Sequence, residues 1–410
     1  MSSSQKVKIA ERAAVLMGQS PPSSACSESG EGMPFIQGNA EFGARNPIPR
    51  LRCSAPTRIA EAGDLLLSVR APVGELNQAT ERIVIGRGLS ALRFRPYDQD
   101  FAWHALKWSA AALNRVAQGS TFVAVSRQDV ESLEIPWHDD ANQPIAAILD
   151  TVDEVIAKTE AVIAKLKQVR AGLLHDLLTR GLDEHGQLRD PIAHPEQFQP
   201  SPLGRIPMGW EVRSLESVTD VSAPICYGIV QALEFVADGV PVLVIRDLLG
   251  DYVTGVHRTA KTIDANFARS RVRPGDVLIS IKGTIGRIDV VPKNYEGNIS
   301  RDLARIRPTD RVRAKYLLHL LRSQVGQKIL EQAQVGTTRA ELSIGPLKRL
   351  HFAFPKPAEQ ESIACMLDEQ EATIRTYEVE LAKLRDLKSG LMADLLTGRV
   401  RVPEGMEVAS

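Results

Sequence analysis

Two stretches of the chain alternate apolar and polar residues with the period of a long amphipathic helix. In residues 143–181 the apolar positions recur alternately three and four apart, the spacing of a heptad seam; they are Ile145, Ile148, Val152, Val155, Thr159, Val162, Leu166, Val169 and Leu173. Residues 361–399 carry a similar stripe, interrupted by Gln370; it consists of Ile363, Leu367, Ile374, Tyr377, Leu381, Leu384, Leu387 and Leu391. Roughly 35 residues of helix extend about 50 Å, and an apolar stripe of that length needs a partner. We therefore expect the two helices to pair with each other, the alternative being two separate core helices.

These two stretches are copies of one another. Shifted by 218 positions they align without a gap, with 15 identities in 39 positions. Weaker echoes lie upstream, at offsets of 212, 217 and 207, and match residues 63–74 with 275–286, 119–126 with 336–343, and 33–43 with 240–250. The repeated unit is therefore a whole domain followed by a helix. The unequal offsets place insertions inside the domains, while the helices keep their length.

Each domain section is predicted to be α+β. Short runs such as LLLSV, IVIG and ALRF in the first domain, and VPVLVI, DVLISI and LARIR in the second, are typical of strands between turns. Helical patches fall at corresponding positions, at residues 101–117 and 315–333. We assign domains to residues 1–140 and 207–357, long helices to 141–180 and 358–398, a Pro-, Gly- and His-rich linker or docking loop to 181–206, and a tail to 399–410.

Composition indicates a folded chain of two or three domains. Hydrophobic residues make up 43% and charged residues 24% of the 410 positions. The four cysteines, Cys26, Cys53, Cys226 and Cys365, form no C-x-x-C pair, so we expect neither a zinc knuckle nor a disulfide framework. Neither a signal-peptide core nor a stretch of about 18 apolar residues is found, so we expect a cytoplasmic protein without membrane contact. Lys plus Arg equals Asp plus Glu at 50 each, which is compatible with a polyanionic partner but does not support one.

Signatures of catalysis are missing from the sequence. It has no G-x-x-x-x-G-K-[ST] phosphate loop, no H-E-x-x-H, no Pro-Asp pair of a nuclease and no N-P-P-[YF] or D-P-P-Y of an amino-methyltransferase. The eight histidines are scattered, and His175, His185 and His194 are interpreted as solvated or docking residues. We expect no catalytic residue, no metal site and no bound cofactor on this chain.

Several motifs together resemble the DNA-sequence-specificity subunits of Type I restriction-modification enzymes. The helix end KLKQVRAGLLHDLLTRGLD with the following GQLR resembles the central region of that family. FQPSPLGRIPMGWEV is similar to the start of its second target domain, and KLRDLKSGLMADLLTGRVRV to its C-terminal helix end. GQSPPSS, PFIQGNAEFG and SVRAPVG resemble one common class of its target recognition domains. The resemblance extends over nearly the whole chain.

The resemblance implies a non-catalytic subunit with two tandem target recognition domains related by an internal pseudo-two-fold repeat. Each domain would read one half of a split site in double-stranded DNA, and the two helices would pair as an antiparallel coiled coil that sets the gap. Two modification subunits would use S-adenosylmethionine to methylate adenine, and restriction subunits would use ATP and Mg for translocation and cleavage. The alternative is a scaffold whose paired helices join two protein-binding domains without DNA.

Residues for DNA contact are sought in the loops that recur in both domains. Arg, Lys, Gln and Asn reach base edges best, whereas Ser, Thr and backbone amides hold phosphates. The candidates are Gln37, Arg70, Arg87, Ser120 and Thr121 in the first domain and Arg246, Lys282, Arg301, Thr337 and Thr338 in the second. Arg70 and Lys282 hold equivalent places in the repeat, and an ordinary surface cation at a strand end is the alternative for both.

Turn and docking roles complete the set of candidate residues. Gly63, Gly74, Gly275 and Gly286 are predicted to serve turns. The shared helix ends and the linker are predicted to dock the modification subunits, with Leu177, Leu178, Leu395 and Leu396 as the residues involved. These leucines could equally close the helix pair internally.

Overall fold

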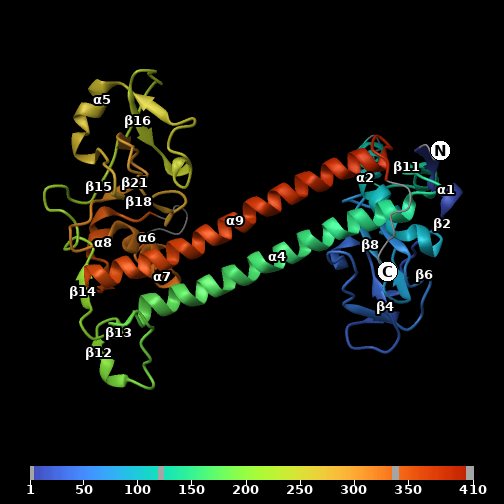
Figure 1. Cartoon of the computed structure of the whole chain (residues 1–410), viewed down its shortest axis with the longest axis horizontal. Coiled ribbons are helices and arrows are strands. Elements are labelled where there is room, and N and C mark those ends of the chain that lie inside the picture. Colours follow the sequence, from blue (N-terminus) through green and yellow to red (C-terminus); the bar gives the residue numbers. More distant parts are fainter. Residues whose placement is uncertain (1–3, 119–123, 335–340, 403–410) are drawn as a thin grey trace. The chain divides into compact units, whose positions relative to one another are not determined.

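The structure is a computed structural model that describes residues 4–118, 124–334 and 341–402, with the backbone alone for 111–118 (Figure 1). The chain divides into two compact units: unit 1 comprises Met1–Ala161 and Glu378–Ser410, and unit 2 comprises Val162–Tyr377. Two long helices, α4 (Asn142–Thr179) and α9 (Pro357–Leu396), each contribute one half to each unit. Each unit therefore holds one repeated domain together with parts of both helices.

Unit 1 is built mainly from short strands. Its elements before α4 are β1 (Gln5–Lys8), α1 (Ile9–Arg12), β2 (Ala14–Met17), β3 (Cys26–Ser27), β4 (Met33–Ile36), β5 (Leu51–Cys53), β6 (Ile59–Ala60), β7 (Leu65–Ser68), β8 (Leu76–Gln78), β9 (Ile83–Ile85), β10 (Leu89–Arg93), α2 (Gln99–Gln118), α3 (Arg127–Ser132) and β11 (Glu134–Trp137). They form a four-stranded sheet in the order β2-β10-β7-β8, a five-stranded sheet in the order β3-β5-β4-β9-β6, and the β1–β11 ladder.

Unit 2 repeats this construction. Its elements between the long helices are β12 (Phe198–Ser201), β13 (Gly204–Pro207), β14 (Glu211–Ser214), β15 (Cys226–Tyr227), β16 (Val240–Leu243), β17 (His257–Thr259), α5 (Lys261–Asn266), β18 (Val277–Ser280), β19 (Ile288–Val290), β20 (Asn298–Ile299), β21 (Leu303–Ile306), α6 (Ala314–Arg322), α7 (Gln324–Gln332), α8 (Ile344–Arg349) and β22 (His351–Phe354). The sheets are β15-β21-β18-β19, β17-β16-β20, and the ladders β14–β22 and β12–β13.

The two domains share the topology of their four-stranded sheets, of one parallel strand pair and of the ladder before each long helix. The order β2-β10-β7-β8 corresponds to β15-β21-β18-β19, and the parallel pair β4–β9 corresponds to β16–β20. In each domain the first strand pairs antiparallel with the last one, β1 with β11 and β14 with β22, directly before a long helix. The α+β duplication expected from the sequence is confirmed.

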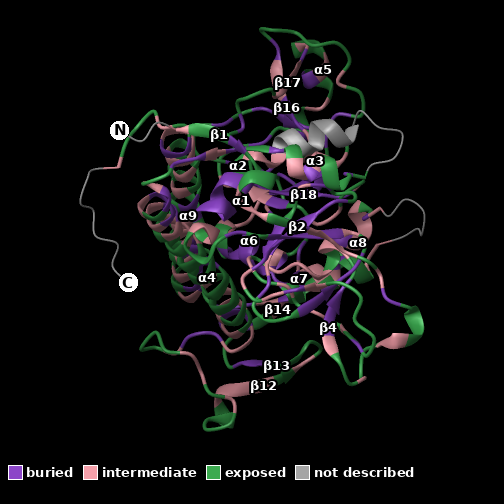
Figure 2. Ribbon diagram, turned by 90° about the vertical axis from the view of Figure 1, so that its right-hand side faces the viewer, coloured by how far each residue is buried: buried purple, intermediate pink, exposed green. Residues whose placement is uncertain are grey.

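The central strands β7 and β18 are buried at every position (Figure 2). A strand covered on both faces carries a continuous apolar run rather than an alternating one, and LLLS and VLIS fit that rule. The helical patch at 315–333 differs from the expected single helix because Ser323 interrupts it. Its backbone is extended, and its hydroxyl accepts a hydrogen bond of 3.0 Å from the Gly326 amide, which caps α7.

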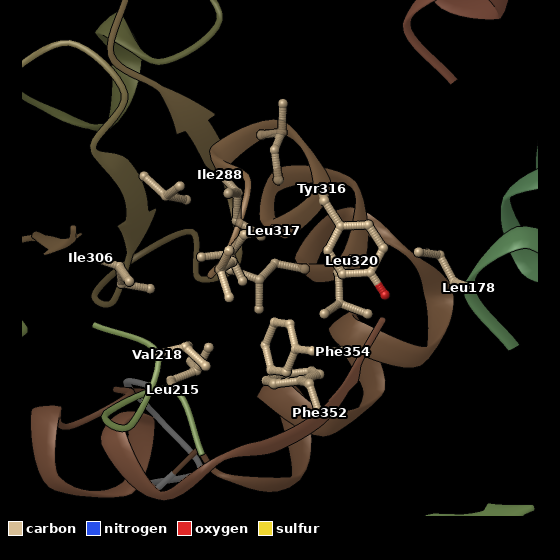
Figure 3. Close-up of a cluster of buried hydrophobic side chains, with 14 of the residues drawn as sticks. Leu178, Leu215, Val218, Ile288, Ile306, Tyr316, Leu317, Leu320, Phe352 and Phe354 are labelled. Atoms are coloured by element: carbon tan, nitrogen blue, oxygen red, sulfur yellow. The ribbon is translucent and has the colours of Figure 1, made fainter. Parts of the chain in front are cut away.

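The core of unit 2 draws on both long helices. Tyr316 and Leu317 of α6 pack with Phe352 and Phe354 of β22 and with Leu178 of α4 (Figure 3). Leu177 of α4 and Ile363 and Leu367 of α9 belong to the same buried cluster. The core of unit 1 is built in the same way with the helix ends exchanged. Ile145 and Leu149 come from the start of α4, and Leu395 and Leu396 come from the end of α9. Each domain thus closes its core with the start of one long helix and the end of the other.

Cross-helix ion pairs show that the two helices run antiparallel. In unit 1, Asp153 of α4 pairs with Lys388 of α9, and Glu160 pairs with Arg385 at 2.7 Å. In unit 2, Arg170 of α4 pairs with Glu371 of α9 at 3.2 Å. Higher numbers on α4 therefore face lower numbers on α9, and the expected antiparallel pairing is confirmed.

The seam on α4 is partly different from the expected one. Ile145, Val152, Thr159, Leu166 and Leu173 are at least partly buried, but the intervening Val155, Val162 and Val169 are exposed. The intervening seam positions are instead Leu149, Ile156, Ile163 and Arg170. Both registers are heptads with apolar residues side by side in sequence, so spacing alone does not distinguish them. On α9, Leu387 was expected in the seam but is exposed. The adjacent Lys388 takes the seam position and pairs with Asp153.

Adjacent residues on α4 test this register. Ile163 is 7% exposed and Val162 is 40% exposed. Replacing Ile163 by Ala should lower the free energy of unfolding by about 2–5 kcal/mol, because it leaves a cavity in the seam. Val162→Ala should change it by less than about 0.5 kcal/mol. Urea denaturation followed by circular dichroism measures both, and equal effects of the two substitutions would contradict the observed seam.

Candidate nucleic-acid interface

Each domain presents the same hairpin loop at one end of its four-stranded sheet. The Ser68 hydroxyl, at the end of β7, donates to the Pro72 carbonyl (2.7 Å) and accepts from the Glu75 amide (2.8 Å). Ser280, at the end of β18, makes the same two hydrogen bonds, to Thr284 (2.5 Å) and from Arg287 (2.8 Å). Because the serine ties both sides of the loop together, the loop holds its residues in a defined place.

The hairpin loops carry the candidates Arg70 and Lys282. Arg70 is exposed and its backbone bridges to Ala124, whereas Lys282 bridges to Glu341 and also forms an ion pair with it at 3.2 Å. Gly74 and Gly286 turn these loops at φ of 89° and 82°, as expected of turn glycines, and Gly63 and Gly275 also have positive φ. The candidates Ser120, Thr121, Thr337 and Thr338 lie outside the described residues.

In unit 1, Gln37 and Arg87 lie beside this loop. The Gln37 side-chain amide donates to the Ser20 hydroxyl (2.8 Å), and that hydroxyl also accepts from the Arg87 backbone amide (3.3 Å). The Val69 amide donates to the Gly88 carbonyl (2.9 Å), which places Arg70 and Arg87 on neighbouring segments. Gln37, Arg70 and Arg87 are exposed, so their polar groups are open to a ligand.

Unit 2 assembles its candidates in the same way. The Ile281 amide donates to the Asp302 carbonyl (2.8 Å), and the Ser300 amide donates to Leu243 (2.8 Å), three residues before Arg246. Lys282, Arg301 and Arg246 therefore lie on adjoining loops. The cations of Arg246 and Arg301 are 3.6 and 3.8 Å from the carboxylates of the residues that follow them, Asp247 and Asp302. Both arginine side chains are largely exposed and both distances are long for an ion pair, so the guanidinium groups remain available to phosphates or bases.

An apolar loop beside these cations was not predicted. Leu233 and Phe235 are 66% and 61% exposed, and Leu233 adopts a left-handed φ of 54°. The loop follows Gly228, which corresponds to Gly18 of unit 1. A Cβ on either glycine would lie within 2.2 Å of a backbone oxygen. In unit 1 the polar GQSPPSS follows the equivalent glycine, and in unit 2 the apolar GIVQALEF does. Comparison of the two repeats after this glycine would have revealed the difference in the sequence.

Matched polar contacts hold each domain on its long helix. In unit 1, Nε2 of the buried His104 on α2 lies 3.2 Å from the Asp150 carboxylate of α4, which Arg45 also contacts at 3.0 Å. In unit 2, Nε2 of the buried His319 on α6 lies 2.9 Å from Asp368 of α9. Asp150 and Asp368 are equivalent in the 218-residue repeat. These contacts orient the domain, and with it the loops, relative to the helix on which it sits.

The electrostatics of these contacts follow from burial and charge. Burial lowers the pKa of His319, which keeps the ring neutral, although hydrogen bonding to Asp368 opposes the shift. Burial alone would raise the pKa of Asp368, but hydrogen bonds from Lys315 and His319 outweigh it and lower that pKa. The same balance, with His104 and Arg45 as the partners, lowers the pKa of Asp150.

Among the described residues, one group of side chains has the spacing to hold a metal ion; it consists of His104, Asp150 and Asp153. Both carboxylates already face cations, Arg45 at Asp150 and Lys388 at Asp153. The donors are therefore neutralised by side chains of the chain itself, and the arrangement fits a structural ion-pair network.

The predicted docking leucines lie inside the protein. Leu177 and Leu178 belong to the core of unit 2, and Leu395 and Leu396 to the core of unit 1. This burial agrees with the alternative considered from the sequence, that they close the helix pair internally. The linker after α4 folds against α9 through the Glu359 carboxylate, which accepts from the Leu182 amide (2.8 Å), from Arg189 (2.7 Å) and from the Trp210 indole (3.2 Å).

Solved structures define the class of protein to which this fold belongs. The S subunit of a Type I restriction-modification system from M. genitalium matches with a TM-score of 0.58 and 16% identity, over 95% of each chain. A chain from a study of complex assembly and conformational transition in the type I R-M system matches with a TM-score of 0.57 and 19% identity, over 97% of this chain and 98% of that one. The fold is that of a Type I specificity subunit.

The model of the Type I restriction modification DNA specificity domain matches residues 1–168 and 207–385. The chain therefore belongs to this family. It is 28% identical to the EcoBI specificity subunit of Escherichia coli, over 74% of this chain and 66% of that one. A Methanocaldococcus jannaschii protein named for the type I restriction enzyme MjaX is 34% identical over 168 residues, 40% of each chain. The alignments thus span 40% and 66% of these two relatives.

Within the described part of the chain, no helix combines the length and apolar character needed to cross a membrane.

The buried histidine of unit 2 predicts a pH dependence of stability. Because the pKa of His319 is lowered in the fold, the unfolded chain takes up the proton first as the pH falls below about 6.5. Stability should therefore fall from pH 7 to pH 5, by at most about 1.4 kcal/mol per pH unit for this group. His319→Gln, which keeps a donor for Asp368, should flatten that part of the curve in urea titrations. Equal curves for wild type and His319→Gln would contradict the assignment.

Proposed function

We propose that this chain is the DNA-recognition subunit of a Type I restriction-modification complex, and that each of its two domains reads one half of a bipartite site. Family membership supports the proposal, as does one observation above all: the same serine-tied hairpin loop occurs twice, each time beside exposed cations. Arg70 and Arg87 in unit 1, and Arg246, Lys282 and Arg301 in unit 2, supply the donors that phosphates and guanine edges accept.

The two domains are proposed to read different half-sites. Gln37 and the polar loop after Gly18 offer hydrogen bonds in unit 1, and Gln37 suits adenine. The loop after Gly228 offers exposed apolar groups in unit 2, which suit thymine methyl groups or a base step. Loops that differ on a shared framework allow one scaffold to recognise two sequences.

The helix pair is proposed as the spacer between the half-sites. A helix of 38 residues such as α4 is about 57 Å long. Its pairing with α9 gives it a stiffness that neither helix has alone. A bipartite site with a fixed gap requires a connection of that kind.

The chemistry is proposed to come from partner subunits in the cytoplasm. Two modification subunits would bring S-adenosylmethionine and methylate adenine, and restriction subunits would bring ATP and Mg for translocation and cleavage. Their docking surface is proposed at the helix ends and the linker. Since Leu177, Leu178, Leu395 and Leu396 are buried, exposed neighbours of these residues would make the contact.

Methylation mapping tests the proposed function. Single-molecule sequencing of DNA from cells that express this chain with its neighbouring modification subunit should show a bipartite methylated motif. Replacing residues 1–140 by the same domain of a relative should change one half of the motif and leave the other half and the gap unchanged. If the modification subunit is active but no motif ever depends on this chain, the scaffold alternative replaces the proposal.

Single arginines refine this test. Arg301→Ala should raise the Kd for duplexes carrying the second half-site, because a base contact contributes about 1–3 kcal/mol, or roughly 5- to 150-fold in Kd. Arg87→Ala should act on the first half-site in the same way. Arg349→Ala removes an exposed cation of α8 that is not among the candidates for DNA contact, and it serves as the control in fluorescence anisotropy. No effect of Arg301→Ala and Arg87→Ala would remove these residues from the interface.

A further inference from the structure

Unit 2 contains a basic cleft that the reading loops do not use. It has a volume of about 710 Å³ and is lined by residues from the segments around α5, β15, β16 and β21. Six of its lining residues are cationic, namely Lys261, Arg269, Arg271, Arg273, Arg305 and Arg307. The acidic residues of the lining are Asp264 and Glu296.

The strands of unit 2 separate this cleft from the candidate interface. β16 begins at Val240, which lines the cleft. It ends at Leu243, whose carbonyl accepts a hydrogen bond from the amide of Ser300, next to Arg301. β21 likewise begins beside Arg301 and ends at Ile306, with Arg305 and Arg307 at the cleft. A strand of four residues spans about 10 Å, so the cleft is a second site of the same domain.

Arg305 is the unusual member of the cleft. It is 2% exposed, and its Nε has no hydrogen-bond partner among the described residues. Its other nitrogens contact the Arg271 and Pro224 carbonyls (3.4 and 2.8 Å) and the Cys226 sulfur (3.8 Å). Because burial raises the pKa of the Cys226 thiol, that group stays neutral and supplies no counter-charge. Among the described residues, this buried guanidinium therefore forms no ion pair with a carboxylate.

The internal repeat shows that the fold does not need this charge. Ile306 pairs with Val277 as Leu92 pairs with Leu65 in unit 1, so Arg305 corresponds to Ala91. Two residues further on, both domains have an arginine that is paired: Arg307 with Asp276 (2.7 Å) and Arg93 with Asp64 (2.7 Å). Unit 2 therefore keeps the structural ion pair of the repeat and adds a second, unpaired arginine behind it.

The remaining charges of the cleft also favour an anion. Arg271 is paired with Asp264, but Lys261, Arg269, Arg273 and Arg305 form no ion pair with any described residue. Four uncompensated cations thus face one uncompensated carboxylate, Glu296. Burial of an unpaired charge is costly, and a bound anion would offset that cost. Guanidinium groups gathered in this way match the oxygens of a phosphate better than a single carboxylate does.

We propose that this cleft of unit 2 is a phosphate-binding site, built around Arg305 and the exposed Arg269 and Arg273. Its ligand is a phosphate group, from the backbone of bound DNA or from a free phosphate compound. The inference is independent of which loops read bases, because it rests on the cleft alone.

Calorimetric titration of the full-length chain with inorganic pyrophosphate is the first arm of the test. Wild type and Arg349→Ala should bind it in a saturable manner, whereas Arg269→Ala/Arg273→Ala should bind at least about tenfold more weakly. Both replaced residues are exposed, so this variant should fold. Arg305→Ala, which restores the residue found at Ala91, should bind none; circular dichroism checks its folding, and if it does not fold the double variant decides.

The second arm distinguishes the two sources of the phosphate. Anisotropy with a duplex is measured from roughly 50 to 250 mM salt, where each lost phosphate contact makes the negative slope of log K against log salt shallower by about 0.9. If DNA supplies the phosphate, the double variant loses about two such contacts. If a free compound supplies it, the slope is unchanged while pyrophosphate binding is lost. The proposal is overturned if the salt slope is unchanged and wild type and double variant bind pyrophosphate equally or not at all. Methylation mapping would still report on DNA recognition in that case.

Discussion

Burial of the leucines at the ends of two antiparallel helices is the constraint on which the rest of this structure depends. Leu177 and Leu178 end α4 in the core of unit 2, and Leu395 and Leu396 end α9 in the core of unit 1. Each core also takes in the start of the opposite helix, through Ile363 and Leu367 or through Ile145 and Leu149. Neither domain can therefore complete its core from its own strands. Each core therefore depends on residues of both long helices.

The two repeats also place polar and charged pairs at equivalent positions of the long helices. His104 with Asp150 and His319 with Asp368 join a domain helix to a long helix. One turn further on, Asp153 with Lys388 and Glu371 with Arg170 join the two long helices. Apolar burial supplies stability without direction, whereas buried polar contacts allow only one geometry. These pairs set the orientation in which each domain presents its loops.

On this common framework the two domains differ at the loops and at the cleft that are proposed to contact ligands. The loop after Gly18 is polar and the one after Gly228 is apolar, although both glycines allow the same close approach of backbone. Arg305 replaces the equivalent of Ala91 in an otherwise matched strand. The loop difference costs little because it lies at the surface, whereas the buried charge of Arg305 is costly unless an anion compensates it. They are the places where a duplicated fold can acquire separate specificities.

The sequence by itself determined the duplication, the α+β class and the pairing of the long helices, because these follow from repeats and from apolar periodicity. It also located candidate residues in loops that adjoin within each domain, although their role in DNA contact stays a prediction; they are Gln37, Arg70 and Arg87 in unit 1 and Arg246, Lys282 and Arg301 in unit 2. Only the tertiary structure decided which of two adjacent heptad registers is buried, since Val162 and Ile163 are both apolar and their spacing allows either. It also decided that the docking leucines face inward and that Arg305 lacks a counter-charge. Burial and pairing depend on residues distant in sequence, and a local pattern contains no record of them.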